Sequence, residues 1–265
     1  MDAAPRLFSR TVGAGGPRVV LLHGLLGQGR NLATVAAGIA ARGYEVTSLD
    51  LPDHGRSPWT DRLDYPSLAG AVARELDELA PVVLLGHSLG GKTAMQVALR
   101  RPELLAGLVV VDIAPVPYAG GETEHVRHLR VMRGLDLASL GSRAEADAAV
   151  AQEVDDERVR GFLLQNLARD GDGWTWRAHL DVLARDLLAV ADFPVPAQVR
   201  PYPGPVLWLA GADSAYVTDA HRPRMLELFP RARLVRFKGV GHWVHSEVPE
   251  LFVDTVVRFL DDVTG

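Results

Sequence analysis

Short runs of apolar residues alternate with longer stretches of helical spacing over the first 111 residues, and again from residue 206 to the end. The apolar runs have the length and near-continuous hydrophobicity of β-strands covered on both faces. They lie at 18–22, 44–49, 82–85, 108–111, 206–209 and 232–237. The helical stretches lie between them at 31–42, 65–79, 90–101 and 219–229, with a last one at 248–260. This alternation predicts βαβ units around a mostly parallel sheet.

The alternation stops in the middle of the chain. From about residue 115 to residue 203 the spacing is helical, and no stretch has a convincing strand pattern. Five prolines between positions 194 and 205 mark the end of this segment. We therefore expect an α/β core formed by residues 1–114 and 204–265, with a helical segment, 115–203, inserted into it.

Composition narrows the range of functions. The net charge is −5 with both signs interspersed, so no basic footprint indicates a nucleic-acid partner. The chain has no cysteine, which excludes disulfides, thiolate metal sites and a cysteine nucleophile. Neither a secretory signal pattern nor an apolar run of about 18 residues is present. The expectation is a cytoplasmic protein with no membrane span, as a monomer or homodimer.

The strongest local signal is the sequence Gly-His-Ser-Leu-Gly at positions 86–90. It matches G-x-S-x-G and stands between a predicted strand and a predicted helix, where a nucleophile elbow must stand. The flanking glycines remove side chains that would clash in such a tight turn. Ser88 is therefore the predicted nucleophile.

A serine hydroxyl needs an adjacent base to attack at neutral pH. His242 follows the last predicted strand, in a loop that can reach the carboxyl edge of the sheet, and it is the predicted base. His245, three residues further on, is a competitor that we place in the following helix or along the cleft. The turn after the first strong strand contains His23 and Leu25, and in this architecture the backbone N–H groups of Leu25 and Leu89 form the oxyanion hole.

The acid that orients the histidine has two candidates. Asp112 ends the strand at 108–111, and Asp213 follows the strand at 206–209. Both strands bring their carboxyl ends to the same edge of a parallel sheet, so either aspartate can orient the imidazole. The spacing alone leaves the choice open.

These motifs, in this order, resemble the α/β-hydrolase superfamily. The residues that carry the resemblance are His23-Gly24, the turn at 50–57, the elbow at 86–90 and Gly241-His242. The resemblance covers nearly the whole chain except the inserted segment, which is similar to the helical cap of that superfamily. It implies a small-molecule substrate whose identity the cap selects.

A narrower resemblance is to a branch of small bacterial acyl-ester hydrolases with mitochondrial relatives. It rests on the residues at 86–92, 112–115, 162–167 and 241–245. In this branch the acid follows the earlier strand, which points to Asp112. The position three residues beyond Gly211, where the superfamily usually has its acid, holds Ser214 here, and we expect Ser214 to support the triad by a hydrogen bond.

The predicted function is therefore hydrolysis of carboxylic esters or thioesters, with short to medium acyl groups, through an acyl-enzyme on Ser88 and without metal or organic cofactor. A cofactor-free lyase or a carbon–carbon bond hydrolase can use the same triad, and arginines such as Arg127, Arg130 or Arg177 in the pocket would favour such an anionic substrate. A non-catalytic ligand receptor is the alternative from another class. Lys92, His125 and His128 are left outside the site, the two histidines because no third metal ligand accompanies them.

Overall fold

The computed structural model describes residues 5–118, 124–195 and 198–265. Its centre is a seven-stranded sheet in the order β1-β3-β2-β4-β5-β8-β9. The strands are β1 (Ser9–Val12), β2 (Arg18–Leu22), β3 (Glu45–Leu49), β4 (Val82–His87), β5 (Leu105–Val111), β8 (Val206–Gly211) and β9 (Ala232–Phe237). Within this sheet of the described residues, β1 runs antiparallel to its neighbour and the other pairs are parallel. The predicted α/β fold with a mostly parallel sheet is confirmed.

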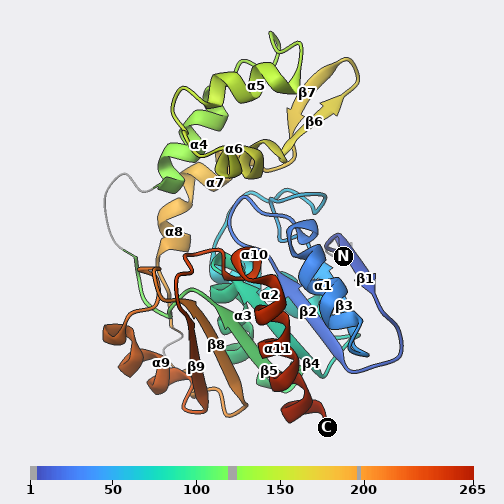
Figure 1. Cartoon of the computed structure of the whole chain (residues 1–265), viewed down its shortest axis with the longest axis vertical. Coiled ribbons are helices and arrows are strands. Elements are labelled where there is room, and N and C mark those ends of the chain that lie inside the picture. Colours follow the sequence, from blue (N-terminus) through green and yellow to red (C-terminus); the bar gives the residue numbers. More distant parts are fainter. Residues whose placement is uncertain (1–4, 119–123, 196–197) are drawn as a thin grey trace.

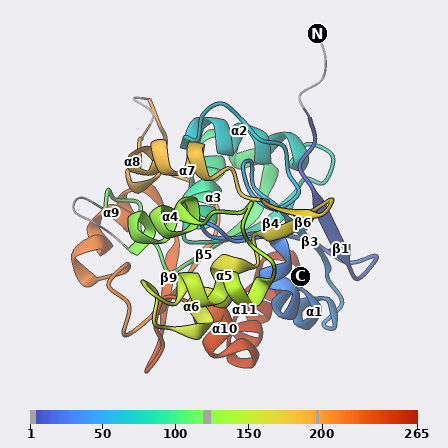
Figure 2. The same ribbon diagram turned by 90° about the horizontal axis from the view of Figure 1, so that it is seen from above.

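Helices cover both faces of this sheet, which explains why its strands are apolar throughout (Figures 1 and 2). Val20 and Leu22 of β2 pack on the side of α2 (Tyr65–Leu76) and α3 (Leu89–Arg100). Val19 and Leu21 point the other way, toward α1 (Ala33–Ala40) and α11 (Pro249–Thr264). Full burial of such a side chain contributes about 1.5–3 kcal/mol, so the apolar runs fix the position of the sheet.

Between β5 and β8 the chain forms a separate lobe above the carboxyl ends of the strands (Figure 1). Its helices are α4 (Glu124–Gly134), α5 (Arg143–Val150), α6 (Glu157–Leu164), α7 (Leu180–Arg185) and α8 (Leu187–Ala191). The side chains of Ser142 and Asp156 accept hydrogen bonds from the first turns of α5 and α6, which fixes where these helices begin. The short helices α9 (Arg222–Leu228) and α10 (Val244–Glu247) belong to the core.

Three strands differ from the sequence-based expectation. The expectation of a segment without strands was wrong, because β6 (Leu167–Asp170) and β7 (Gly173–Trp176) form an antiparallel hairpin within it. Its turn contains Gly171 at φ +56°, a conformation that glycine adopts without strain. Strand β1 was also not predicted, because this four-residue edge strand is mostly exposed and polar. Among the described residues, no helix has both the length and the apolar character needed to cross a membrane.

Lys92 joins the core to the end of the lobe. It lies on α3, is 1% exposed, and its Nζ donates to the carbonyls of Ala191 and Asp192 at 2.8 Å each. Burial lowers the pKa of Lys92 to about 7. These contacts at the end of α8 place Lys92 in the connection between core and lobe.

Candidate active site

Ser88 stands in a strained turn between β4 and α3. Its backbone has φ +52° and ψ −115°, which is unusual for a residue with a side chain. A Cβ on Gly86 would lie 2.1 Å from the carbonyl oxygen of Gly90, and one on Gly90 would lie 2.5 Å from that of His23. The two glycines are therefore required for the turn that places Ser88 at the start of the helix.

Asp112 contacts the imidazole of His242. It is fully buried, follows β5 at φ +48°, and its Oδ2 lies 2.7 Å from Nδ1 of His242. The other oxygen, Oδ1, accepts the N–H of Gly211 at 3.0 Å, and Ser214 Oγ also hydrogen-bonds to Oδ2. The carboxylate is thus held in one orientation, and because Nδ1 of His242 is occupied, Nε2 is the nitrogen left for other partners.

Asp213 lies elsewhere. Its side chain is exposed, and its backbone N–H donates to the carbonyl of Val240 at 3.0 Å. The structure thus brings together Asp112, Ser214 and His242, and leaves Asp213 outside this group. Tyr216, which the sequence did not single out, packs its ring against His242 at 4.2 Å between centroids. No local sequence pattern marks this tyrosine.

Among the residues that the structure describes, the backbone N–H groups of Leu25 and Leu89, both near Ser88, have no acceptor. Leu89 is the first residue of α3, where N–H groups have no partner within the helix and the helix dipole favours negative charge. The carbonyl of Gly24 accepts from Gly27 N at 2.9 Å and makes a second contact with His23 Nδ1 at 2.8 Å. Since a trans peptide directs its C=O and N–H to opposite sides, these bonds also fix the N–H of Leu25.

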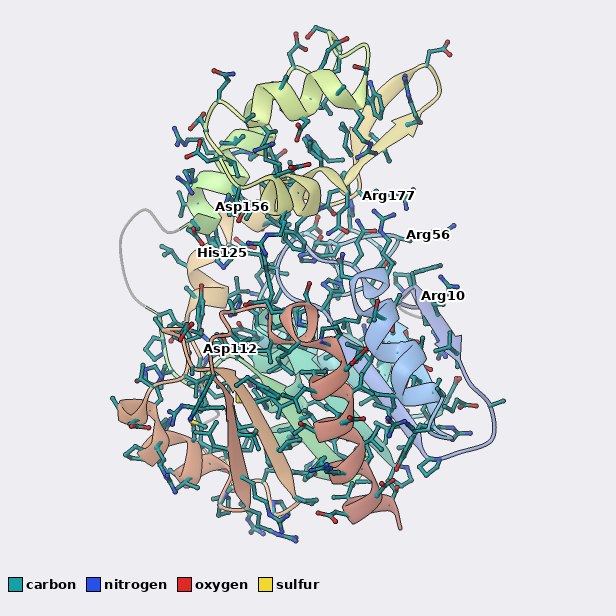
Figure 3. The ribbon with its side chains drawn as sticks, viewed as in Figure 1. Arg10, Arg56, Asp112, His125, Asp156 and Arg177 are labelled. Atoms are coloured by element: carbon teal, nitrogen blue, oxygen red, sulfur yellow. The ribbon has the colours of Figure 1, made fainter. Side chains whose placement is uncertain are left out.

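Ser88 and His242 line one cavity of about 860 Å³ between the core and the lobe. The core contributes His23, Leu25, Tyr216 and Trp243, and the lobe contributes His125, Val159 and Phe162. Figure 3 shows His125 in the lobe above Asp112 in the core. The lining includes Arg158 and none of Arg127, Arg130 and Arg177, so the arginine-rich pocket considered for an anionic substrate is not found. No metal-binding cluster occurs within the described parts of the chain.

Several buried histidines surround the site without contacting Asp112. His245 packs its ring 4.7 Å from that of His87, and His87 Nε2 lies 3.0 Å from the carbonyl of His242. Burial lowers the pKa of His23, His54 and His245 to about 4 and that of His87 well below its usual value. These side chains are therefore neutral at pH 7, and one of them, His87, packs its ring 4.7 Å from that of His242.

The pH dependence of stability follows from these shifts. An unfolded histidine takes up a proton near pH 6.5, whereas His23, His54 and His245 take theirs near pH 4 when folded. Their contribution to stability is complete above pH 6.5 and is lost as the pH falls toward 4, at roughly 1–2 kcal/mol per histidine by pH 5. Urea unfolding at pH 7.5 and 5.0 measures this loss, and the His245→Asn variant should show a smaller one. An equal loss in that variant would contradict the assignment for His245.

Comparison with known proteins places this geometry in a family. A family model described as the alpha/beta hydrolase family matches residues 19–255. The chain therefore belongs to the α/β-hydrolase family. It is 38% identical over 253 residues to the sn-1-specific diacylglycerol lipase ABHD11 of Xenopus laevis, covering 93% of this chain and 80% of that protein.

Two further relatives extend the comparison. The esterase YbfF of Escherichia coli is 32% identical over 250 residues, 92% of this chain and 93% of that protein. A solved structure titled as a marine microorganism esterase superposes with a TM-score of 0.92 at 30% identity, covering 97% of this chain and all of the other. These relatives confirm the resemblance found in the sequence, and they agree with the predicted enzyme class, a carboxylic ester hydrolase.

Proposed function

We propose that this enzyme cleaves carboxylic esters or thioesters through a covalent acyl-enzyme on Ser88. The observation that carries the proposal is the 2.7 Å contact between the buried Asp112 and His242, whose side chain lines the same cavity as a serine on a strained elbow. A carboxylate–histidine pair that serves only the fold has no need of a serine in a strained turn. A serine in such a turn, for its part, does not attack an ester without a base beside it. The combination is what acyl transfer requires.

The reaction proceeds in two steps. Ser88 Oγ attacks the substrate carbonyl while Nε2 of His242 accepts the hydroxyl proton. The oxyanion binds to the N–H groups of Leu25 and Leu89, and His242 then gives the proton to the leaving alcohol or thiol. Water, deprotonated by His242, attacks the acyl-enzyme and releases the acid and Ser88. Asp112 remains ionised and stabilises the imidazolium, with Ser214 and Gly211 holding the carboxylate.

We further propose that residues 115–203 act as a cap on a core formed by 1–114 and 204–265. The support is that Val159 and Phe162 line the cavity from the lobe. The ring of Phe162 lies 5.7 Å from that of Trp243, a residue of the core, and both aromatic side chains line the cavity. A substrate with a short to medium acyl group fits this cavity of about 860 Å³.

This substrate range is tested with p-nitrophenyl esters of increasing acyl length. We expect kcat/KM to be highest for chains of about four to eight carbons, because a cavity of this size encloses a small molecule. The Phe162→Ala variant should shift the optimum to longer chains, and Val126→Ala serves as the control because Val126 is an exposed residue of α4 that does not line this cavity. An optimum at long chains in the wild type, or one that Phe162→Ala leaves unchanged, contradicts the proposed acyl site.

A further inference from the structure

The loop after β2, residues 23–28, contains Leu25, one of the two proposed oxyanion donors. We call this segment the oxyanion loop. Leu26 within it has φ +60°, a conformation that costs a leucine of order 1–3 kcal/mol and persists only where surrounding contacts hold it. Leu26 is 1% exposed, so water does not supply those contacts.

The lobe supplies the contact. Asn166, between α6 and β6, is fully buried, and its Nδ2 donates to the carbonyl of Leu26 at 2.8 Å and to that of Leu163 at 3.2 Å. Its Oδ1 accepts from Gln28 Nε2 at 3.0 Å. Both donors and the acceptor of the amide are therefore engaged, two of the three by the oxyanion loop. Asn166 belongs to the sequence at 162–167 that the narrower resemblance singled out without a role.

Asn166 is itself fixed within the lobe. Its backbone carbonyl accepts from Arg177 N at 2.8 Å, and the bond to Leu163 ties its side chain to the end of α6. The adjacent Gln165 makes a different side-chain contact with the core, because its Oε1 accepts from Asn31 at 2.6 Å. Its backbone carbonyl, which a change of side chain leaves in place, accepts from Arg30 at 2.7 Å and from Gln28 Nε2 at 3.4 Å. Gln165 thus helps to attach the lobe, whereas Asn166 alone of the pair contacts the carbonyl of Leu26.

We propose that Asn166 is a positioning residue that holds the oxyanion loop in its reactive shape from the lobe. Its bond fixes the peptide between Leu26 and Gly27, and the N–H of that peptide donates to the carbonyl of Gly24 at 2.9 Å. Losing the bond lets Leu26 relax toward negative φ, which releases the Gly24 carbonyl and turns the N–H of Leu25 away from the oxyanion. The lobe then has two roles: it shapes the substrate pocket, and through Asn166 it holds the oxyanion loop of the core in place. This inference rests on the proposed role of Leu25 as an oxyanion donor.

The Asn166→Asp variant tests this directly, because aspartate keeps the size and the acceptor for Gln28 but replaces the donor to Leu26 with an oxygen. We expect kcat for p-nitrophenyl butyrate to fall about 10- to 100-fold with KM within about threefold, part of the 10²–10³ that one oxyanion donor contributes. The inhibition constant of 1,1,1-trifluoro-2-hexanone, which forms an oxyanion adduct with the serine, should weaken by a similar factor.

Gln165→Ala is the matched control. Its kcat for p-nitrophenyl butyrate and the inhibition constant of the ketone should both stay within about threefold of the wild type. If Asn166→Asp gives no cooperative thermal melt, Gln28→Leu replaces it, with a kcat-selective loss of about 3- to 10-fold expected because Asn166 loses one of its orienting partners. Unchanged inhibition by the ketone in the variant that folds, or an equal effect of Gln165→Ala, overturns the inference. A wild type that the ketone does not inhibit contradicts the proposed function instead.

Discussion

Replacing Ser88 by alanine is expected to lower kcat for p-nitrophenyl butyrate by about 10⁴-fold or more, because no other group can then form the acyl-enzyme. Residual hydrolysis should remain above the rate in water, since the oxyanion donors and the cavity are intact. Steady-state rates at saturating substrate measure the effect. KM should change little, because the side chain removed is only a hydroxyl group.

Ser246→Ala is the matched control for this experiment, because Ser246 lines the same cavity but is exposed. Its kcat should stay within about threefold of the wild type. Both variants should melt at temperatures close to that of the wild type. A Ser88→Ala protein that keeps a tenth or more of the activity would show that another group attacks the ester.

The second large effect is expected for Asp112→Asn. Asparagine keeps the shape but cannot stabilise the imidazolium, and its amide favours the wrong tautomer of His242, so kcat should fall by about 10⁴-fold. Asp213→Asn, whose exposed side chain lies outside the Asp112–Ser214–His242 group, should stay within about threefold. Rates for both variants with the same ester, together with their melting temperatures, make the comparison.

The reverse ranking would assign the acid to Asp213 and refute the role proposed for Asp112. Equal and small losses in both variants would mean that His242 acts without an ionised partner. Because Asp112 also accepts from Gly211 N at 3.0 Å, the melting temperature of Asp112→Asn shows whether a loss of folding contributes to its effect.

Much of the fold could be predicted because the sheet is covered on both faces. Val82 to Leu85 are all 0–1% exposed, which demands a continuous apolar run that the sequence displays. Strand β1 needs no apolar run, because it lies at the edge of the sheet and pairs through its backbone. Its residues Ser9, Arg10 and Thr11 are exposed. The β6–β7 hairpin was missed because each strand has only four residues and most of their side chains are exposed or partly buried, so no apolar run marks them. The spacing of two residues between Trp174 and Trp176 is the strand period and is the one local signal for β7.

The parts of the site that depend on local sequence could also be predicted. The turn at Ser88 is encoded by its neighbours Gly86 and Gly90, and needs no distant information. The choice between Asp112 and Asp213 depends instead on how two neighbouring strands direct their ends, and only the resemblance distinguished them. The contact between Asn166 and Leu26 joins positions 140 residues apart, so no spacing pattern reveals it.

The most direct test of the central claim is to mix the enzyme with an excess of a fluorophosphonate and measure its intact mass, followed by peptide mapping. We predict a single adduct on Ser88 in the wild type and no adduct in Ser88→Ala, while Ser246→Ala is labelled like the wild type. A folded wild type that stays unlabelled, or an adduct on another residue, would contradict an acyl-enzyme on Ser88.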